Sequence, residues 1–221
     1  GQPVLTGASF WDTETSGQPT SAGGTGLTTA LMQTKATFED AGWDFDNEWT
    51  LVGKKYPTSD QVLDASCIIN LEDLQAMVTD SNQVYVVTRY INAADSYRWN
   101  GGLGFEPIGN ASTPFAGRLY GVGNPIDNLY INRPGLDGCG LFGEIAPTAS
   151  IFDLTLRGAR IVGRDAVGVV AGRTAGSTLS DVQLIGCRVA GANTVGGVTG
   201  AAEQGASFSE IDVRAGVKAS G

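Results

Sequence analysis

A repeated pattern in the second half of the chain constrains the fold more than any other feature of the sequence. Four related stretches of alternating apolar and polar residues begin at positions 126, 151, 179 and 208, so their starts lie 25, 28 and 29 residues apart. A second, glycine-bounded motif precedes three of them, as GLFG at 140–143, VVAG at 169–172 and GVTG at 197–200. Two motifs that keep one phase over several copies indicate a structural repeat.

The repeat predicts stacked coils of β-strands. Alternation of apolar and polar residues is the period of a strand, and the intervals are too short and too rich in glycine to hold a helix between strands. In stacked coils, each apolar residue packs on its counterparts in the coils above and below. The alignment gives two buried columns: Leu154 with Val182 and Ile211, and Leu156 with Leu184 and Val213. We therefore predict an all-β fold, a right-handed parallel β-solenoid (β-helix) with short capping helices.

The same alignment places polar residues in one column at a corner of the solenoid, namely Asn128, Asp153, Asp181 and Glu210. Carboxylates in neighbouring coils, about 4.8 Å apart, repel each other. Two sets of arginines at matching offsets would relieve this repulsion, Arg157 with Arg214, or Arg160 with Arg188. A bound calcium ion is the alternative. We favour hydrogen bonds to local backbone amides and therefore expect neither a metal site nor another cofactor.

Short helices and aromatic residues mark the first half of the chain. Thr28 is a predicted helix N-cap, and a turn at Gly42 is expected to gather the aromatic side chains Trp43, Phe45 and Trp49. We interpret these aromatics as a plug that covers the open edge of a solenoid coil. Asn70 is predicted to cap a helix over residues 71–78, and strand structure is expected from Val84.

Composition argues against several classes of function. The chain has no histidine, which removes the commonest general base and metal ligand, so we expect no enzymatic activity. The net charge of -9 disfavours nucleic acid and anionic membranes as partners. No apolar run is long enough to span a bilayer, so membrane insertion is not expected. Cys67, Cys139 and Cys187 have no metal-site spacing, and one disulfide would be the maximum.

The chain resembles the GLUG-motif repeats of secreted bacterial and archaeal surface proteins and adhesins. The resemblance rests on EDLQA at 72–76, FEPIG at 105–109, FAG at 115–117, IDNL at 126–129, GLFG at 140–143, VGVVAG at 167–172 and VGGVTG at 195–200. FWDTETSG at 10–17 and GWDF at 42–45 look like the closing segment of that family. The resemblance implies an extracellular or cell-surface location and a structural or adhesive role.

The order of these segments departs from the family, in which the closing segment ends an array. Here the segment that resembles it comes first, so we predict a closing or capping segment, residues 1–57, and a solenoid domain, residues 58–221. One explanation is head-to-tail assembly, in which the first segment covers the last coil of a neighbouring copy or adjacent repeat. The predicted contact residues are Phe10, Trp11, Trp43, Phe45, Trp49, Phe208, Ile211 and Val213. An arbitrary register of a tandem array is the other explanation.

A carbohydrate-binding or carbohydrate-cleaving module is the competing interpretation. Exposed aromatics such as Tyr97, Trp99 and Tyr120 would then line a groove for a surface glycan, and a protein ligand is a further alternative. Asp153 and Asp181 would lie near the separation of about 5 to 5.5 Å between the carboxylates of retaining glycosidases, but any stacked carboxylate pair would do so. Fold analogy alone supports cleavage, so we favour the structural role.

Overall fold

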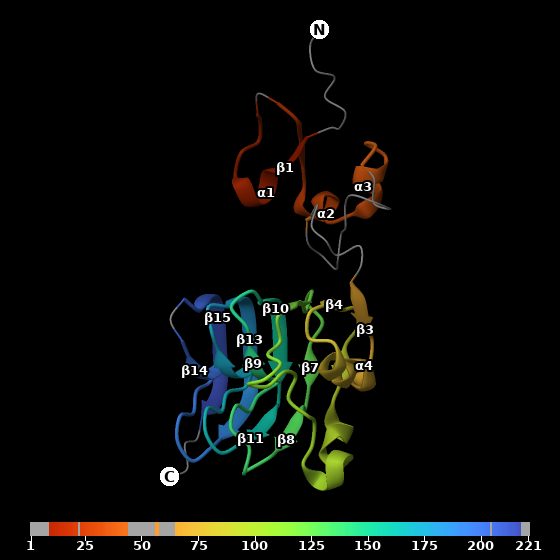
Figure 1. Ribbon diagram of the computed structural model, residues 1–221. Helices are drawn as coiled ribbons and strands as arrows, with labels where there is room; N and C mark the ends of the chain where they lie inside the picture. Colours follow the sequence, from red (N-terminus) through yellow and green to blue (C-terminus); the bar gives the residue numbers. More distant parts are fainter. Residues whose placement is uncertain (1–8, 22, 44–55, 58–64, 204, 218–221) are drawn as a thin grey trace. The chain divides into compact units, whose positions relative to one another are not determined.

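The chain is described by a computed structural model that covers residues 9–21, 23–43, 56–57, 65–203 and 205–217. It divides into two compact units, Gly1–Asp64 and Ala65–Gly221 (Figure 1). Each unit is described separately below. The predicted boundary between residues 57 and 58 adjoins residues 58–64, which lie outside the described part.

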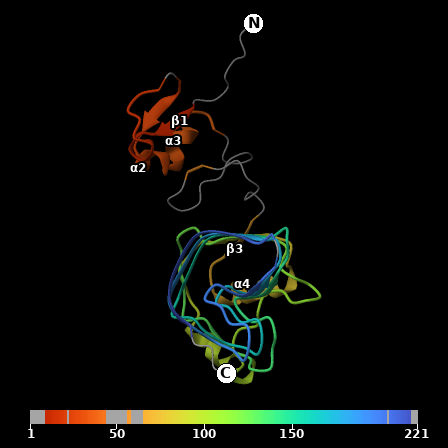
Figure 2. The ribbon, with the colours of Figure 1, turned by 90° about the vertical axis from the view of Figure 1, so that its left-hand side faces the viewer.

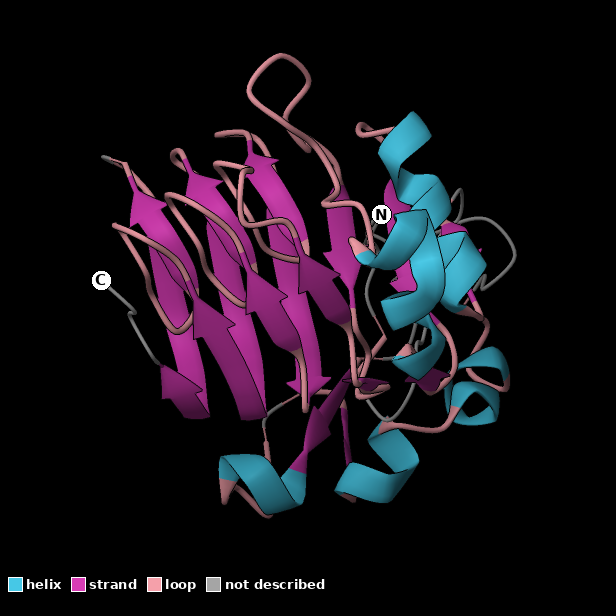
Figure 3. Cartoon of the chain, turned by 90° about the horizontal axis from the view of Figure 1, so that it is seen from below, coloured by secondary structure: helices cyan, strands magenta, loops and turns pink. Residues whose placement is uncertain are grey.

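The second unit is a parallel β-solenoid, which confirms the predicted fold class. Viewed at right angles to Figure 1, its coils superimpose and outline one closed loop (Figure 2). Its named strands form a 10-stranded and a 3-stranded sheet, and every strand pair within them is parallel. The strands of successive coils therefore lie side by side in rows (Figure 3).

Four rows of strands make up the wall of the solenoid. The first contains β3 (Ser66–Ile68), β4 (Val84–Val87), β6 (Arg118–Tyr120) and the first halves of β10 (Ser150–Arg157), β13 (Thr178–Ala190) and β15 (Ser207–Val217). The second contains β5 (Ile91–Asn92), β7 (Ile126–Asp127) and the later parts of the three long strands. The third contains β8 (Tyr130–Asn132), β11 (Arg160–Val162) and the ends of β13 and β15. The fourth contains β9 (Phe142–Ile145), β12 (Ala171–Thr174) and β14 (Thr199–Ala202).

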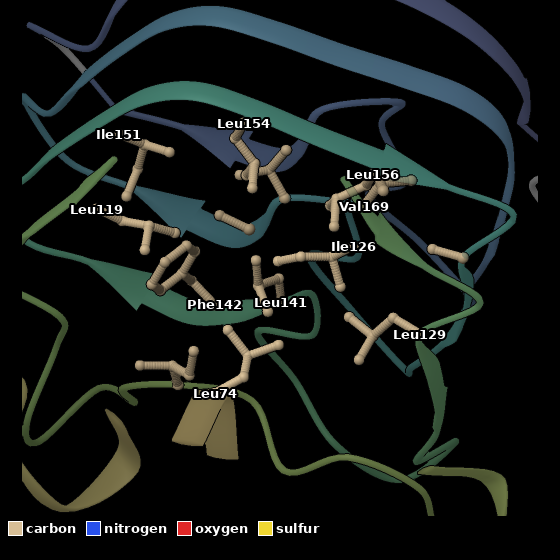
Figure 4. Packing of buried hydrophobic residues seen from close by; sticks show 14 of the residues in the cluster. Leu74, Leu119, Ile126, Leu129, Leu141, Phe142, Ile151, Leu154, Leu156 and Val169 are labelled. Atoms are coloured by element: carbon tan, nitrogen blue, oxygen red, sulfur yellow. The ribbon is translucent and has the colours of Figure 1, made fainter. Parts of the chain in front are cut away.

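The core consists of apolar columns that run along the solenoid. Leu154 pairs with Val182, and Val182 with Ile211, as the repeat predicts. Leu156, Leu184 and Val213 form the adjacent column. Figure 4 shows Leu154 and Leu156 pointing into one interior, which they share with Leu119, Ile126, Leu141, Phe142 and Val169. The second glycine-bounded motif is also in phase, because Phe142, Ala171 and Thr199 pair in the fourth row.

The predicted alignment of the first copy of the repeat is wrong. Ile126 pairs with Leu156, and Leu119, not Ile126, pairs with Ile151. The corner between β6 and β7 is two residues longer than the bend at Asp153 within β10, so the pattern IDNLYI belongs to the second and third rows. Asn128 is therefore not part of the predicted acidic column. It stands beside Gly158 of the next coil.

Left-handed backbone conformations make the corners. Asp153, Asp181 and Glu210 have φ values of 53°, 59° and 52°, and they bend each long strand between the first and second rows. Asn128 and Gly158 adopt φ values of 59° and 64° at the next corner. Asparagine and aspartate tolerate this region because their short side chains bond locally, which explains why the repeat has polar residues there.

Helices close the end of the solenoid at which β3 lies. The helix α4 (Leu71–Ala76) begins at Asn70, whose side chain accepts a hydrogen bond from the amide of Asp73 at 2.7 Å, as predicted. Its Leu71 and Leu74, with Met77 of the 3₁₀ helix η2 (Met77–Thr79), are buried in the common core. A second 3₁₀ segment, η3 (Ala94–Gly102), follows β5.

The first unit has a small fold of its own. The parallel strands β1 (Phe10–Asp12) and β2 (Thr25–Leu27) flank α1 (Thr13–Ser16), and α2 (Thr29–Met32) and α3 (Lys35–Glu39) follow. The predicted N-cap is confirmed, since Thr28 Oγ1 accepts a hydrogen bond from the amide of Leu31 at 3.4 Å.

Close backbone packing in the fourth row predicts a sharp difference between two glycines. A Cβ at Gly172 would overlap backbone atoms of Gly138 and Cys139, whereas a Cβ at Gly135, in an open turn, would have no atom of a non-neighbouring residue within 4 Å. We expect Gly172→Ala to lower the free energy of unfolding by about 1–3 kcal/mol, as overpacked sites do, and Gly135→Ala to change it by less than about 1 kcal/mol. Denaturant unfolding of both variants, followed by circular dichroism, measures the difference. Equal stability of the two variants would contradict this account of the row.

Candidate functional site at the open edge of the solenoid

The strand β15 forms the edge of the first three rows. It pairs in parallel with β13 from Ser207 to Val217, and in the described part of the chain no strand pairs with its other side. Figure 3 shows this strand at the outer margin of the rows. An unpaired edge presents backbone N–H and C=O groups that accept a further strand.

The apolar columns are exposed where they reach this edge. Leu179 and Leu184 are completely buried, yet Phe208 and Val213, which stand beside them one coil later, are 39% and 40% exposed. Ile211 continues the column of Leu154 and Val182 and is only partly buried. The three residues predicted as contacts, Phe208, Ile211 and Val213, thus form one apolar strip, which we call the edge strip.

The opposite end of the solenoid differs, because α4 and η2 cover it. Leu74 and Met77 have no exposed surface and join the same core cluster as the strands. Figure 4 shows Leu74 pointing toward the interior residues from a position at the margin of the core. One end of the solenoid is therefore capped by side chains from its own unit, and the other presents the edge strip.

The predicted aromatic plug is partly a core of the first unit. The ring of Phe38 lies 5.3 Å from that of Phe10 and 5.0 Å from that of Trp43, and Phe38 is 1% exposed. Phe10 and Trp43 are half-buried. Sequence reasoning missed Phe38, although its place in an apolar position of a short helix close to Trp43 is a signal. Phe45 and Trp49 lie outside the described residues.

Trp11 is held on the other side of β1. Its indole N–H donates a hydrogen bond to the carbonyl of Gln18 at 3.0 Å, and its ring lies against Gly26, where any Cβ would overlap it. The structure therefore brings Phe10 and Trp43 together and places Trp11 on the opposite face of the strand, as alternation along a strand requires.

A buried carboxylate joins the start of this unit to its end. Asp12 caps α1 by accepting hydrogen bonds from the amides of Glu14 and Thr15, and its Oδ2 accepts one from the Tyr56 hydroxyl at 2.6 Å. Burial would raise the pKa of Asp12, but these hydrogen bonds, with one from Thr29, hold its pKa well below the usual range. The same contact with Asp12 raises the pKa of Tyr56. No sequence pattern indicates this pair, since 44 residues separate its members.

One of the two sets of arginines predicted to neutralise the acidic column, Arg157 with Arg214, has other partners. Arg157 donates two hydrogen bonds to Asp127 of the preceding coil, at 2.6 and 2.9 Å, and Arg214 pairs with Asp212 of its own strand at 3.0 Å. Within the described residues, no group of three His, Cys, Asp or Glu side chains could hold a metal ion.

The aromatics proposed for a glycan groove are used in different ways. Trp99 is half-buried and stacks on Phe105 at 6.5 Å, so it packs on the core. Tyr120 stacks on Phe152 of the next coil at 5.3 Å, and Tyr97 is exposed with its hydroxyl bonded to Arg98. All three cysteines are free thiols, and burial raises the pKa of Cys139 to about 12. None of the helices in the described ranges has the length and apolar character that crossing a membrane requires.

The Asp12–Tyr56 contact predicts how acid affects the first unit. A carboxylate whose pKa is lowered by folding contributes stability above its unfolded pKa of about 3.9, and this contribution is lost as the pH falls toward the folded value. Tyr56→Phe removes one hydrogen bond to the charged form, so we expect the pKa of Asp12 to rise. Titration of the Asp12 carboxyl carbon by NMR measures the change, with Tyr97→Phe as the control. An unchanged Asp12 pKa in Tyr56→Phe would refute the role of this contact.

Comparison with known proteins gives two relatives, each much longer than the matched segment. Halomucin of Haloquadratum walsbyi is 39% identical over 122 residues, which is 54% of this chain and 1% of that protein. A putative Gly-rich membrane protein of Evansella cellulosilytica is 31% identical over 124 residues, 56% of this chain and 14% of that protein. No family model matches, so membership of the GLUG-motif family remains a prediction, and no solved structure matches. The chain is thus similar to small parts of two large proteins.

Proposed function

We propose that this chain is a structural repeat module of an extracellular filament or adhesin, and that it assembles head to tail through its N-terminal segment, residues 1–57. The observation that carries the proposal is the edge strip. Phe208, Ile211 and Val213 occupy positions that are buried in earlier coils, and here they meet solvent or a partner. Large apolar side chains at an unpaired strand edge are a known cause of strand-to-strand association.

The contact between two copies is expected to be weak by itself and to become strong when many modules are joined. Complete burial of a large apolar side chain contributes about 1.5–3 kcal/mol, and part of that is already realised for these half-exposed residues. Association also costs several kcal/mol of lost translational and rotational freedom. A single joint is therefore weak between free copies and becomes effective when modules are linked or concentrated.

A cell-surface location fits both the composition and the relatives. One relative is named as a membrane protein, and the other, Halomucin, contains a segment 39% identical to this chain. A net charge of -9 favours solubility of a crowded array outside the cell. The proposed role is mechanical and needs no catalytic group, because stacked coils produce a stiff rod from repeated contacts between neighbours.

Substitution in the edge strip tests the proposal. Phe208→Asp places a charge at the joint, and we expect it to keep the chain monomeric at concentrations where the unmodified chain forms rods. Ile185→Asp is the matched control, because Ile185 is 38% exposed on β13 but faces outward between Arg157 and Arg214. Sedimentation velocity and electron microscopy over a dilution series give the readout. Monomers of the unmodified chain at every concentration, or rods formed equally well by Phe208→Asp, would refute the proposal.

A further inference from the structure

The two ends of the proposed joint share a sequence. Residues 7–10 and 205–208 both read Gly-Ala-Ser-Phe, and an acidic residue follows each phenylalanine by two positions, Asp12 in one case and Glu210 in the other. Elsewhere in the solenoid, residues that recur in this way stand in the same column of successive coils. The shared sequence therefore indicates that the strand at residue 10 fits the row to which Phe208 belongs.

The two phenylalanines are the first residue of β1 and the second residue of β15, and both strands are paired in parallel. Phe208 of β15 stands beside Leu179 of β13, and its column continues through Ile151, Leu119 and Tyr85. Phe10 of β1 stands beside Thr25 of β2, and its ring packs on Phe38 and Trp43. Each strand thus directs its phenylalanine toward an apolar cluster and places the residues on either side of it on the opposite face.

Each of these strands has one unused edge. In the described ranges, β15 pairs with β13 alone and β1 pairs with β2 alone. Both pairings are parallel, and β15 keeps one register with β13 from Ser207 to Arg214. Joining the two free edges would therefore extend the first row without changing its direction.

We propose that β1 of a second copy adds to β15 as a parallel strand, with Ser9 beside Ser207, Phe10 beside Phe208 and Trp11 beside Ser209. The row would then run β13–β15–β1–β2 across the joint. This inference rests on the proposed head-to-tail function and specifies its partner and register.

The register explains how the edge strip would be covered. Phe10 would extend the column of Leu179 and Phe208, and Phe38 and Trp43, which contact Phe10, would come with it over the end of the core. Trp11 would remain outside with Ser209, beside Gly26 of β2. The joint would therefore use both faces of β1 with the side chains in the positions that they already have in the first unit.

The same register explains why the row ends after the joint. Glu210 has a left-handed conformation with a φ of 52°, which bends β15 into the second row. Asp12 stands at the equivalent position with a φ of -81° and caps α1. The chain of the second copy leaves the row at Asp12, so side chains, not a further strand, would cover Ile211 and Val213.

Cysteine cross-linking tests the register in the full-length chain. Ser9, Ser207 and Ser209 are exposed, and the exposed native thiol is removed by Cys67→Ser in every variant. One preparation carries Ser9→Cys and a second carries Ser207→Cys; a third, with Ser209→Cys, is the matched control. Adjacent parallel strands place paired Cα atoms about 4.8 Å apart, within disulfide reach, whereas an offset of two residues gives about 8 Å.

We expect a mixture of the Ser9→Cys and Ser207→Cys chains to form a disulfide-linked dimer at least about ten times faster than the mixture with Ser209→Cys. Faster linking to Ser209→Cys would overturn the register. A fourth preparation carries Ser9→Cys and Ser207→Cys in the same chain. A disulfide between residues 9 and 207 within one copy, with none between copies, would overturn the choice of partner. A third outcome combines the two experiments: no disulfide forms between copies, yet the unmodified chain forms rods and Phe208→Asp abolishes them. This outcome would overturn the register and leave the proposed function standing.

Discussion

Parallel pairing of each coil with the next, in one register, is the constraint on which the rest of the structure depends. It places Leu154, Val182 and Ile211 in one column and repeats this arrangement in every row. A coil buries its apolar side chains only against the coils next to it. The side chains of the last paired coil therefore lack this contact on one side. The partial exposure of Phe208 and Val213 therefore follows from the fold and is not an isolated surface feature.

The sequence was sufficient to predict the architecture because the repeat is local and regular over its later copies. The columns of Leu154 and Leu156 and the cap at Asn70 follow from spacing alone, and all are confirmed. The first copy was misaligned because the corner at 121–125 contains two additional residues, while IDNLYI happens to keep the same alternation. A pattern of alternation fixes which residues face inward, but not which coil position each one occupies.

The candidate site divides into a part that the sequence predicts and a part that it does not. Phe208, Ile211 and Val213 follow from extending the columns by one coil. The roles of Phe10 and Trp43 do not follow, because an aromatic cluster in a short segment serves equally as its own core or as a plug, and the structure shows contacts of the first kind through Phe38. The Asp12–Tyr56 contact depends on a chain reversal across 44 residues, for which no periodicity gives a signal.

The difference between the two ends of the solenoid gives the proposed array a direction. At the β3 end, Leu71, Leu74 and Met77 cover the core from within the same unit, so nothing further is needed there. At the β15 end, one more strand with an inward-facing phenylalanine would cover the exposed column. Residues 7–12 and 205–210 differ little in sequence, yet Glu210 turns the strand into the next row and Asp12 starts a helix. In the proposed array, the conformation at that position, left-handed at Glu210 or helix-capping at Asp12, would decide whether the row bends into a further strand or ends.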